Sequence, residues 1–324
     1  EAGGDTLRAK LGLLLALPVL VWNLCRAMLR ADAVHVRCPG SFGLLGVLLA
    51  PLCVRRRVAK YAGQWTGYPG EPWSYRLQRR LLRSRWWGSP VTVYGKWPKQ
   101  PEHVVPFFTS VLGEAHLDRA RRAAAGKRFG SPLRTLFTGR LTAAKNVDVL
   151  IRAVAQVRAT GFDVECDIVG EGPELPRLER LASELGISAA VRFAGGLEFE
   201  RVLDHYEQAD VLVLASETEG WPKALAEGMA FGLVPVGSDR GLVPQMLGGG
   251  RGHVIPPRDL TALADVLRRM ASDPESLYGP SARAAAWGQR YSLEQVREAL
   301  RILLAERWNV TLAAAARGET VSPP

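Results

Sequence analysis

Short apolar runs alternate with longer amphipathic stretches along the chain from residue 133 onward. Brief apolar runs bounded by polar or glycine-rich turns are typical of strands buried on both faces of a parallel sheet. The runs that predict strands are 133–138, 162–169, 191–194, 211–215, 233–236 and 253–255. The stretches with helical spacing are 145–158, 175–185, 199–208, 223–231, 260–271 and 292–308. This alternation predicts an α/β domain with a doubly wound parallel sheet.

The part of the chain before residue 109 repeats this pattern less regularly. Apolar runs at 33–37, 58–62, 91–94 and 104–108 predict strands, and 44–52 predicts a helix. These elements indicate a second Rossmann-like domain. Its start looks truncated, because we find no strand followed by a glycine-rich turn before residue 33.

An apolar stretch at residues 11–22 precedes the first predicted strand. Its 12 residues are too few to span a bilayer. Asn23, Arg26 and Arg30 follow it at helical spacing. We therefore expect a buried helix in this region.

A change of composition separates the two predicted domains. After Thr109 the chain becomes rich in Ala and Arg, which indicates a connecting segment. The predicted organisation is an incomplete N-terminal domain (1–108), a linker (109–131), a C-terminal domain (132–290), a last helix (291–310) and a disordered tail (311–324).

The net charge of +10 is unevenly distributed. Residues 1–130 carry 21 Lys and Arg against 7 Asp and Glu, whereas the remainder carries 21 against 25. This asymmetry indicates an anionic partner for the first part of the chain, such as a membrane surface or a charged glycan. Nucleic acid is not favoured, because we find no nucleic-acid-binding motif. The four cysteines show no metal-ligand spacing and are best suited to a reducing cytosol.

The segment 73–87 concentrates part of this charge. Arg76, Arg79, Arg80 and Arg83 fall on one face of a predicted helix. One interpretation is a helix that packs on its domain with solvated arginines. The other is an interfacial helix that meets anionic lipid. In that case the residues at the membrane boundary would be Trp73, Trp86 and Trp87.

Two carboxylates lie within the strand–helix–strand unit at 209–238. Glu219 is in the loop after the strand at 211–215, and Glu227 is eight positions further on, on the next helix. Ligands of open α/β sheets bind at the carboxyl ends of the strands, where Glu219 is expected. The alternative interpretation of each residue is a solvated surface glutamate, which for Glu219 taken alone explains the pattern equally well.

Two cations bracket an earlier strand-to-helix turn. Gly139 and Arg140 follow the strand at 133–138, and Lys145 opens the next predicted helix. Gly139 permits a close approach to the backbone, and helix N–H groups favour anions. This arrangement suits a diphosphate.

The segments EGWPKALAEGMAFGLVPV and FTGRLTAAKNVDVLIRAV resemble the E-x7-E and G-R-x4-K segments of GT-B glycosyltransferases, in particular retaining family four. The resemblance implies that Glu219 contacts the donor sugar and that Glu227 holds the ribose hydroxyls. It also implies that Arg140 and Lys145 stabilise the leaving diphosphate in place of a metal ion. No D-x-D sequence occurs, which disfavours a metal-dependent transferase of the other major fold. The residues expected to bind the donor are Gly139, Arg140, Lys145, Glu171, Glu219, Gly220, Trp221, Pro222, Lys223 and Glu227.

The expected activity is hexosyl transfer, class EC 2.4, from a nucleotide-diphosphate sugar to a glycan or lipid-linked acceptor. The resemblance further implies that the reaction belongs to polysaccharide or glycolipid biosynthesis, needs no metal and retains the anomeric configuration. No cofactor is expected, because the nucleotide-diphosphate sugar is a substrate. The expected location is cytoplasmic, with the inner face of the membrane as a candidate docking surface. Candidate acceptor-side residues are Ser41, Gln64 and Trp65.

One departure from the family pattern leaves alternatives open. The family commonly has a His at the end of the strand that reads 58–62 here, whereas this chain continues Ala62-Gly63-Gln64. Gln64 can donate and accept hydrogen bonds but cannot carry a proton charge. The contribution of this domain to catalysis is therefore open. A nucleotide-sugar epimerase of GT-B fold is one alternative, although the two segments together favour transfer. A non-catalytic nucleotide-sugar-binding subunit is the other, because the first glycine-rich turn is missing.

Overall fold

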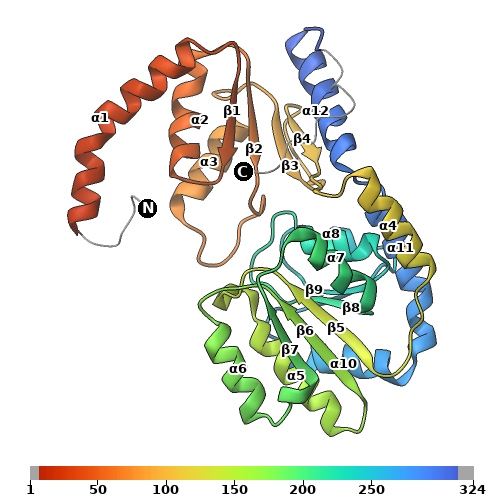
Figure 1. Ribbon diagram of the computed structural model, residues 1–324. Helices are drawn as coiled ribbons and strands as arrows, with labels where there is room; N and C mark the ends of the chain where they lie inside the picture. Colours follow the sequence, from red (N-terminus) through yellow and green to blue (C-terminus); the bar gives the residue numbers. More distant parts are fainter. Residues whose placement is uncertain (1–6, 313–324) are drawn as a thin grey trace. The chain divides into compact units, whose positions relative to one another are not determined.

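The computed structural model describes residues 7–312, which fall into two compact units (Figure 1). Unit 1 comprises the described residues up to Phe107 together with 301–312, and unit 2 comprises residues 108–300. The tail expected at 311–324 lies outside the described residues from position 313 onward.

Unit 1 is built on a four-stranded parallel sheet. Its strands are β1 (Val34–Cys38), β2 (Arg57–Tyr61), β3 (Val91–Tyr94) and β4 (Val104–Phe107), paired in sequence order. Its helices are α1 (Leu7–Leu29), α2 (Ser41–Cys53) and α3 (Trp73–Arg83). Trp87, Tyr61 and Leu82 are the largest fully buried side chains of its core.

Helix α1 is not the buried helix that the apolar run predicted. Within residues 16–29 Met28 alone is buried, while Val19, Trp22 and Leu29 are 62%, 68% and 68% exposed. Helix α1 contacts α2 at the edge of unit 1, and no other helix of the described part of this unit covers its outer side (Figure 1). An apolar run indicates which residues avoid water, but it does not supply the element that would cover them.

The basic helix predicted at 73–87 forms as α3, with two corrections. Arg79 turns inward and pairs with the buried carboxylate of Glu71, so Arg76, Arg80 and Arg83 are the exposed arginines of α3. Trp87 is fully buried and donates its ring N–H to the carbonyl oxygen of Pro90 at 3.3 Å. Trp87 therefore belongs to the core of unit 1 and cannot stand at a membrane boundary.

Unit 2 contains a six-stranded, fully parallel sheet in the order β10-β9-β8-β5-β6-β7. Its strands are β5 (Leu133–Thr138), β6 (Val164–Val169), β7 (Val191–Gly195), β8 (Val211–Leu214), β9 (Val234–Ser238) and β10 (His253–Ile255). The chain adds strands on one side from β5 to β7 and then returns to the other side of β5 with β8. The strand order therefore reverses between β5 and β8, and ligands of open α/β sheets bind at such a reversal.

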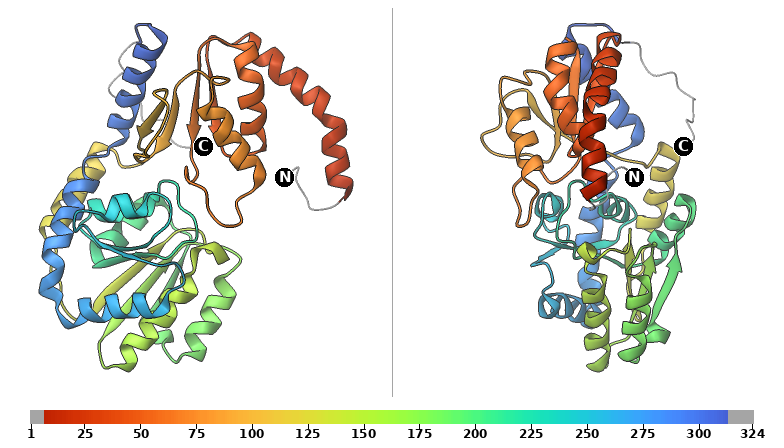
Figure 2. Two further views of the ribbon diagram at one scale, coloured as in Figure 1. Left: turned by 180° about the vertical axis from the view of Figure 1, so that it is seen from behind. Right: turned by 90° about the vertical axis from the view of Figure 1, so that its left-hand side faces the viewer.

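Helices surround this sheet (Figure 2). They are α4 (Glu114–Ala125), α5 (Val147–Ala159), α6 (Leu175–Glu184), α7 (Phe199–Gln208), α8 (Lys223–Ala230), α9 (Val243–Leu247), α10 (Leu260–Ser272) and α11 (Tyr278–Gly288). Short 3-10 turns occur at Ala143–Lys145, Ser188–Ala190 and Pro274–Leu277. A last helix, α12 (Leu293–Trp308), contains the division between the two units.

The segment expected to be a linker, 109–131, contains helix α4. Arg119 on α4 forms ion pairs with Asp204 and Glu207 of α7, each at 2.6 Å. Lys127 is buried, and its Nζ donates to the carbonyl oxygens of Tyr206 and Glu207 at 3.1 and 2.9 Å, close to the C-terminal end of α7. These contacts make the segment part of unit 2.

Candidate active site

The candidate site lies at the carboxyl edge of the unit 2 sheet, where β5 and β8 end. Gly139 directly follows β5 with a φ of 147°, a conformation that favours glycine. A Cβ at Gly170, after β6, would lie 1.9 Å from the carbonyl oxygen of Gly139. The two loops therefore touch backbone to backbone, and a side chain at Gly170 would force them apart.

Asn146 joins the loop after β5 to the loop after β8. Its side-chain amide donates to the carbonyl oxygen of Ala215 at 2.8 Å and to Oε1 of Glu217 at 3.2 Å. Asn146 has a φ of 51° and separates the 3-10 turn that contains Lys145 from α5, which begins at Val147. Lys145 therefore lies just before the helix, and not in its first turn as the sequence predicted.

Lys145 and Glu219 contact each other directly. Nζ of Lys145 lies 2.7 Å from Oε1 of Glu219, whose side chain is 9% exposed. The cation expected at the diphosphate and the carboxylate expected at the sugar are thus brought together from two loops 74 residues apart. Within the described residues Oε2 of Glu219 makes no hydrogen bond, so this oxygen can accept one from a ligand.

Arg140 differs from Lys145 because its side chain is exposed and has no partner among the described residues. Arg140 is the second residue after β5, and among residues 7–312 no carboxylate forms an ion pair with its guanidinium. An unpaired guanidinium beside a paired lysine is well suited to an anion, because it binds without first breaking an ion pair.

Glu227 is held by a buried chain of hydrogen bonds. The hydroxyl of Tyr206 on α7 donates to its Oε2 at 2.9 Å and lies 3.0 Å from the hydroxyl of Thr138 on β5. Burial raises the pKa of Glu227, an effect that the Tyr206 hydroxyl and the charge of Lys223 partly offset. Burial also raises the pKa of Tyr206 well above its ordinary value, so its hydroxyl remains a donor.

The other residues expected to bind the donor surround these groups. Glu171 is exposed in the loop after β6 and accepts a hydrogen bond from the N–H of Gly196 at 3.3 Å. Pro222 is the N-cap of α8, and Lys223, its first residue, is exposed. Trp221, after Gly220, packs in an aromatic cluster with Trp287 and Tyr291, at ring-centre distances of 6.0 and 5.4 Å.

The three candidate acceptor-side residues belong to unit 1. Ser41 is the exposed first residue of α2. Gln64 is 8% exposed and donates to the hydroxyl of Thr66 at 3.2 Å. Its own Oε1 is buried and has no hydrogen-bond partner among the described residues. Trp65 is 4% exposed, packs edge-on against Tyr61 and donates to Gln100.

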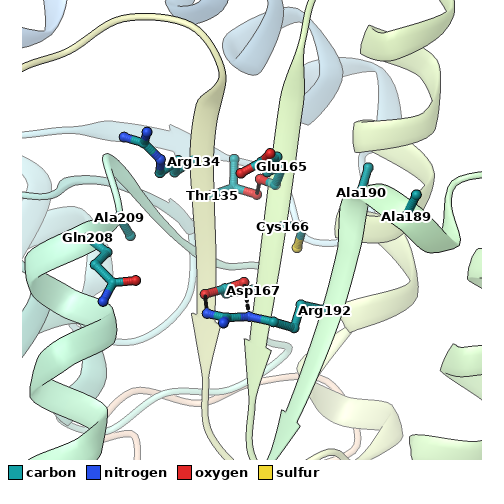
Figure 3. A pocket seen from close by; sticks show the side chains of 10 residues that line it. All are labelled: Arg134, Thr135, Glu165, Cys166, Asp167, Ala189, Ala190, Arg192, Gln208 and Ala209. Carbon is teal, nitrogen blue, oxygen red and sulfur yellow. Dashed lines mark hydrogen bonds and ion pairs between the residues drawn. The ribbon is translucent and has the colours of Figure 1, made fainter.

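The surface pocket drawn in Figure 3 lies elsewhere on unit 2. It has a volume of about 330 Å³ and is lined by the first residues of β5 and β6, including Arg134 and Cys166, and by Arg192 of β7. An ion pair between Asp167 and Arg192 crosses it. This pocket lies at the amino ends of the strands. Because open α/β sheets bind ligands at the carboxyl ends of their strands, it is not the candidate active site. Within residues 7–312 no cluster of three His, Cys, Asp or Glu side chains is placed to hold a metal ion.

Sequence reasoning missed Asn146, Glu217 and Tyr206. Glu217 accepts hydrogen bonds from Asn146 and from Arg258, at 3.2 and 2.5 Å. The one local signal was Asn146, because asparagine is favoured in left-handed backbone. Nothing in the local sequence distinguishes Tyr206 from an ordinary helix residue. Its role appears only in the fold, where its hydroxyl on α7 reaches Glu227 on α8.

Solved structures establish the fold. The Anabaena protein HepE, crystallised with UDP and glucose, matches with a TM-score of 0.69 at 17% identity over 89% of this chain and 81% of that chain. Sucrose-phosphate synthase from Thermosynechococcus elongatus matches with a TM-score of 0.71 at 19% identity over 95% and 82%. With the two parallel sheets described above, these matches define a GT-B fold and confirm the predicted fold class.

The sequence also matches a family profile. The profile described as glycosyl transferases group 1 covers residues 118–287, which is more than half of the chain. The chain therefore belongs to the glycosyl transferases group 1 family.

Two curated relatives illustrate the range of that similarity. A GDP-mannose-dependent alpha-(1-6)-phosphatidylinositol monomannoside mannosyltransferase of Mycolicibacterium smegmatis is 32% identical over 282 residues, 79% of this chain and 70% of that protein. A D-inositol 3-phosphate glycosyltransferase of Streptomyces avermitilis is 36% identical over 188 residues, 53% of this chain. The match spans only 40% of the length of this second relative. Neither name favours an epimerase or a non-catalytic subunit.

Proposed function

We propose that this chain is a retaining, metal-independent glycosyltransferase of family four, class EC 2.4. It transfers a hexosyl group from a nucleotide-diphosphate sugar to a glycan or lipid-linked acceptor. The observation that carries the proposal is the arrangement at the β5–β8 reversal. There, an unpaired Arg140 lies on the same sheet edge as two carboxylates that are each anchored through one oxygen.

The chemistry follows from where charge develops. When the bond between sugar and diphosphate breaks, negative charge accumulates on the diphosphate oxygens. Arg140 and Lys145 supply fixed positive charge at this edge, which stabilises the departing diphosphate without a metal ion. Lys145 is already oriented by Glu219 at 2.7 Å, so little reorganisation is needed when the donor enters.

The two carboxylates have different roles in this proposal. Oε1 of Glu219 remains hydrogen-bonded to Lys145, and Oε2 accepts hydrogen bonds from sugar hydroxyls, which orients the hexosyl group. Oε2 of Glu227 remains hydrogen-bonded to Tyr206, and Oε1 accepts hydrogen bonds from ribose hydroxyls. A carboxylate held in this way recognises hydroxyl donors at a small entropic cost, because its own rotamer is fixed before the ligand arrives.

The acceptor is proposed to be a glycan or a membrane-borne lipid. The name of the Mycolicibacterium relative specifies a phosphatidylinositol mannoside as its substrate. The basic balance of residues 1–130 is consistent with an acceptor presented at an anionic membrane on its cytoplasmic face. Within the described residues no helix has both the length and the apolar character needed to cross a bilayer.

Gln64 is the proposed acceptor-side contact of unit 1. Its Oε1 is buried and accepts no hydrogen bond from the part of the chain that the structure describes. This is a costly condition for a carbonyl oxygen unless a ligand or water satisfies it. A ligand hydroxyl at this position would satisfy it. A glutamine can bind the hydroxyl but cannot exchange a proton with it, so its contribution is to position the ligand.

A panel of nucleotide-diphosphate sugars, tested first by thermal shift, identifies the donor. The chosen donor is then incubated with glycan and lipid-linked acceptors, and the anomeric proton coupling of the product is read by NMR. Transfer with retained configuration is the expected result. Conversion of the donor alone into another nucleotide-sugar, or binding without turnover with every acceptor, would reject the proposal.

A further inference from the structure

Large hydrophobic side chains are exposed mainly in unit 1. Of the eleven such residues in the described part of the chain, eight lie between positions 19 and 86. They are Val19, Trp22, Leu29, Phe42, Leu48, Leu52, Trp73 and Trp86. Six of the eight belong to α1 and α2, which contact each other and diverge toward the first residues of α1 (Figure 2). Gathered apolar surface of this kind marks an interaction site.

Helix α2 buries its small residues and exposes its large ones. Its buried positions are Gly43, Gly46, Val47 and Ala50. A Cβ at Gly46 would lie 2.8 Å from Cγ1 of Val36, so the helix backbone lies directly on β1. Phe42 and Leu52 are 69% and 70% exposed. A helix with water on its outer face carries polar residues there, yet α2 has no polar side chain other than Ser41 and Cys53.

Arginines accompany this surface in the sequence. Arg26 and Arg30 lie at the end of α1, and Arg55 and Arg56 follow α2. All four side chains are exposed and without an ion pair among the described residues. Residues 1–107 carry 16 Lys and Arg against 5 Asp and Glu. Two copies of the chain that met through these helices would bring like charges together, whereas anionic headgroups would neutralise them.

We propose that the α1–α2 surface, meaning the exposed hydrophobic residues of these two helices with the four arginines beside them, docks on an anionic lipid bilayer. The apolar side chains enter the boundary between headgroups and acyl chains, and the arginines bind phosphate headgroups. The docking is peripheral. This inference rests on the membrane association proposed above and specifies its surface. It does not depend on the transfer reaction.

The sequence alone pointed to a different surface, helix α3. Of the four arginines considered in the segment 73–87, Arg79 pairs with Glu71, and of its three tryptophans Trp87 is buried. Helix α3 therefore supplies a charge-matched control. Arg76 and Arg80 are exposed on α3, and their replacement removes the same charge as replacement of Arg55 and Arg56.

The test measures co-sedimentation with phosphatidylcholine vesicles that contain or lack phosphatidylglycerol. The wild-type protein is expected to bind the anionic vesicles, and less so as salt rises. Trp22→Ser/Phe42→Ser/Leu52→Ser is expected to lower the partition coefficient by at least about tenfold, since each side chain loses apolar burial. Val254→Ser/Tyr278→Ser, which changes exposed apolar residues of unit 2, should bind like wild type. Arg55→Gln/Arg56→Gln should bind about tenfold more weakly, and more weakly than Arg76→Gln/Arg80→Gln.

The proposal is overturned if wild type ignores anionic vesicles at low salt, or if the triple variant binds as wild type does. It is also overturned if the wild type is a dimer that the triple variant makes monomeric while vesicles leave both in solution. Thermal melting shows whether the variants fold, and Trp22→Ser alone is used if the triple variant does not. Nucleoside diphosphate binding, measured without vesicles, shows separately whether the proposed donor site fails.

Discussion

At the scale of single residues, Glu219 and Glu227 each form a hydrogen bond through one carboxylate oxygen, and within residues 7–312 neither forms one through the other oxygen. The E-x7-E pattern placed them on one loop and one helix, which the structure bears out. It did not reveal their partners, because Lys145 and Tyr206 lie 74 and 21 positions away in the chain. Contacts over such separations are formed by the fold and are not encoded in a local pattern.

Arg140→Ala is expected to weaken nucleoside diphosphate binding by about 1.5–3 kcal/mol, because a charge-assisted hydrogen bond is lost. Titration calorimetry with the diphosphate of the identified donor measures this. Arg134→Ala is the matched control, since Arg134 is an exposed arginine near the opposite end of the same strand. Equal affinities for the two variants would refute the assignment of Arg140.

Glu227→Gln is expected to stabilise the fold while weakening donor binding. Burial raises the pKa of Glu227 in the folded protein above its ordinary value of 4.5. As pH rises above 4.5, the unfolded chain releases this proton before the folded one does, so the wild type loses stability up to the folded pKa. Glutamine does not titrate, and it can still accept from Tyr206.

Melting temperatures of both proteins between pH 4 and pH 8 test this directly. The difference in favour of Glu227→Gln should be smallest at the acid end and grow with pH. Donor affinity at neutral pH should fall in the same variant. A constant difference across the range would mean that Glu227 titrates normally in the folded protein.

At the scale of elements, the loops after β5 and β8 form one structure because Asn146 joins them. Its left-handed backbone ends the 3-10 turn and starts α5, while its amide reaches the end of β8. The sequence predicted α5 correctly but placed its start at Lys145, two residues early. Helices α4 and α11 were missed because they are rich in alanine and contain few large apolar residues to mark a helical face.

Replacement of Asn146 separates its two roles. Asn146→Gly keeps the backbone conformation and loses both side-chain hydrogen bonds, at a cost of about 1–3 kcal/mol. Asn146→Ala is expected to lower the free energy of unfolding by about 1–2 kcal/mol more, because alanine is strained in left-handed backbone. Urea denaturation measures both values.

The control for the backbone effect is Asn309→Ala. Asn309 is exposed, has a similar φ of 50°, and makes no side-chain hydrogen bond within the described residues. It should therefore show the backbone cost alone. If Asn146→Gly proved as stable as wild type, the two loops would not depend on this side chain.

At the scale of the whole molecule, short apolar runs that alternate with amphipathic stretches were enough to predict two parallel-sheet units, because strands buried on both faces of a parallel sheet are almost continuously hydrophobic. The sequence could not show which surfaces stay uncovered. The run at 11–22 was expected to be buried, yet Trp22 is 68% exposed. Whether an apolar helix is covered depends on its neighbours in the fold and not on its own residues.

Turnover is expected to persist in a chelator, since Arg140 and Lys145 supply the positive charge that a metal ion would otherwise provide. Initial rates with the identified donor and acceptor, measured in excess EDTA and again with added manganese or magnesium, should agree. An activity that disappears in EDTA and returns with either metal would contradict the proposed mechanism. Arg140→Ala serves as the control, and its loss of rate should be equal with and without the metal.

Because α2 buries its small residues and exposes its large ones, its inward and outward positions differ in the substitutions that they tolerate. At inward positions such as Gly46, β1 leaves no room for a larger side chain, so we expect substitutions there to be destabilising. Outward positions such as Phe42 and Leu52 touch little of the chain, so their identity can drift without altering the sheet. Evolution can therefore change the affinity of the α1–α2 surface for a membrane by substitutions at these outward positions. The residues around Glu219 and Glu227 need not change at the same time.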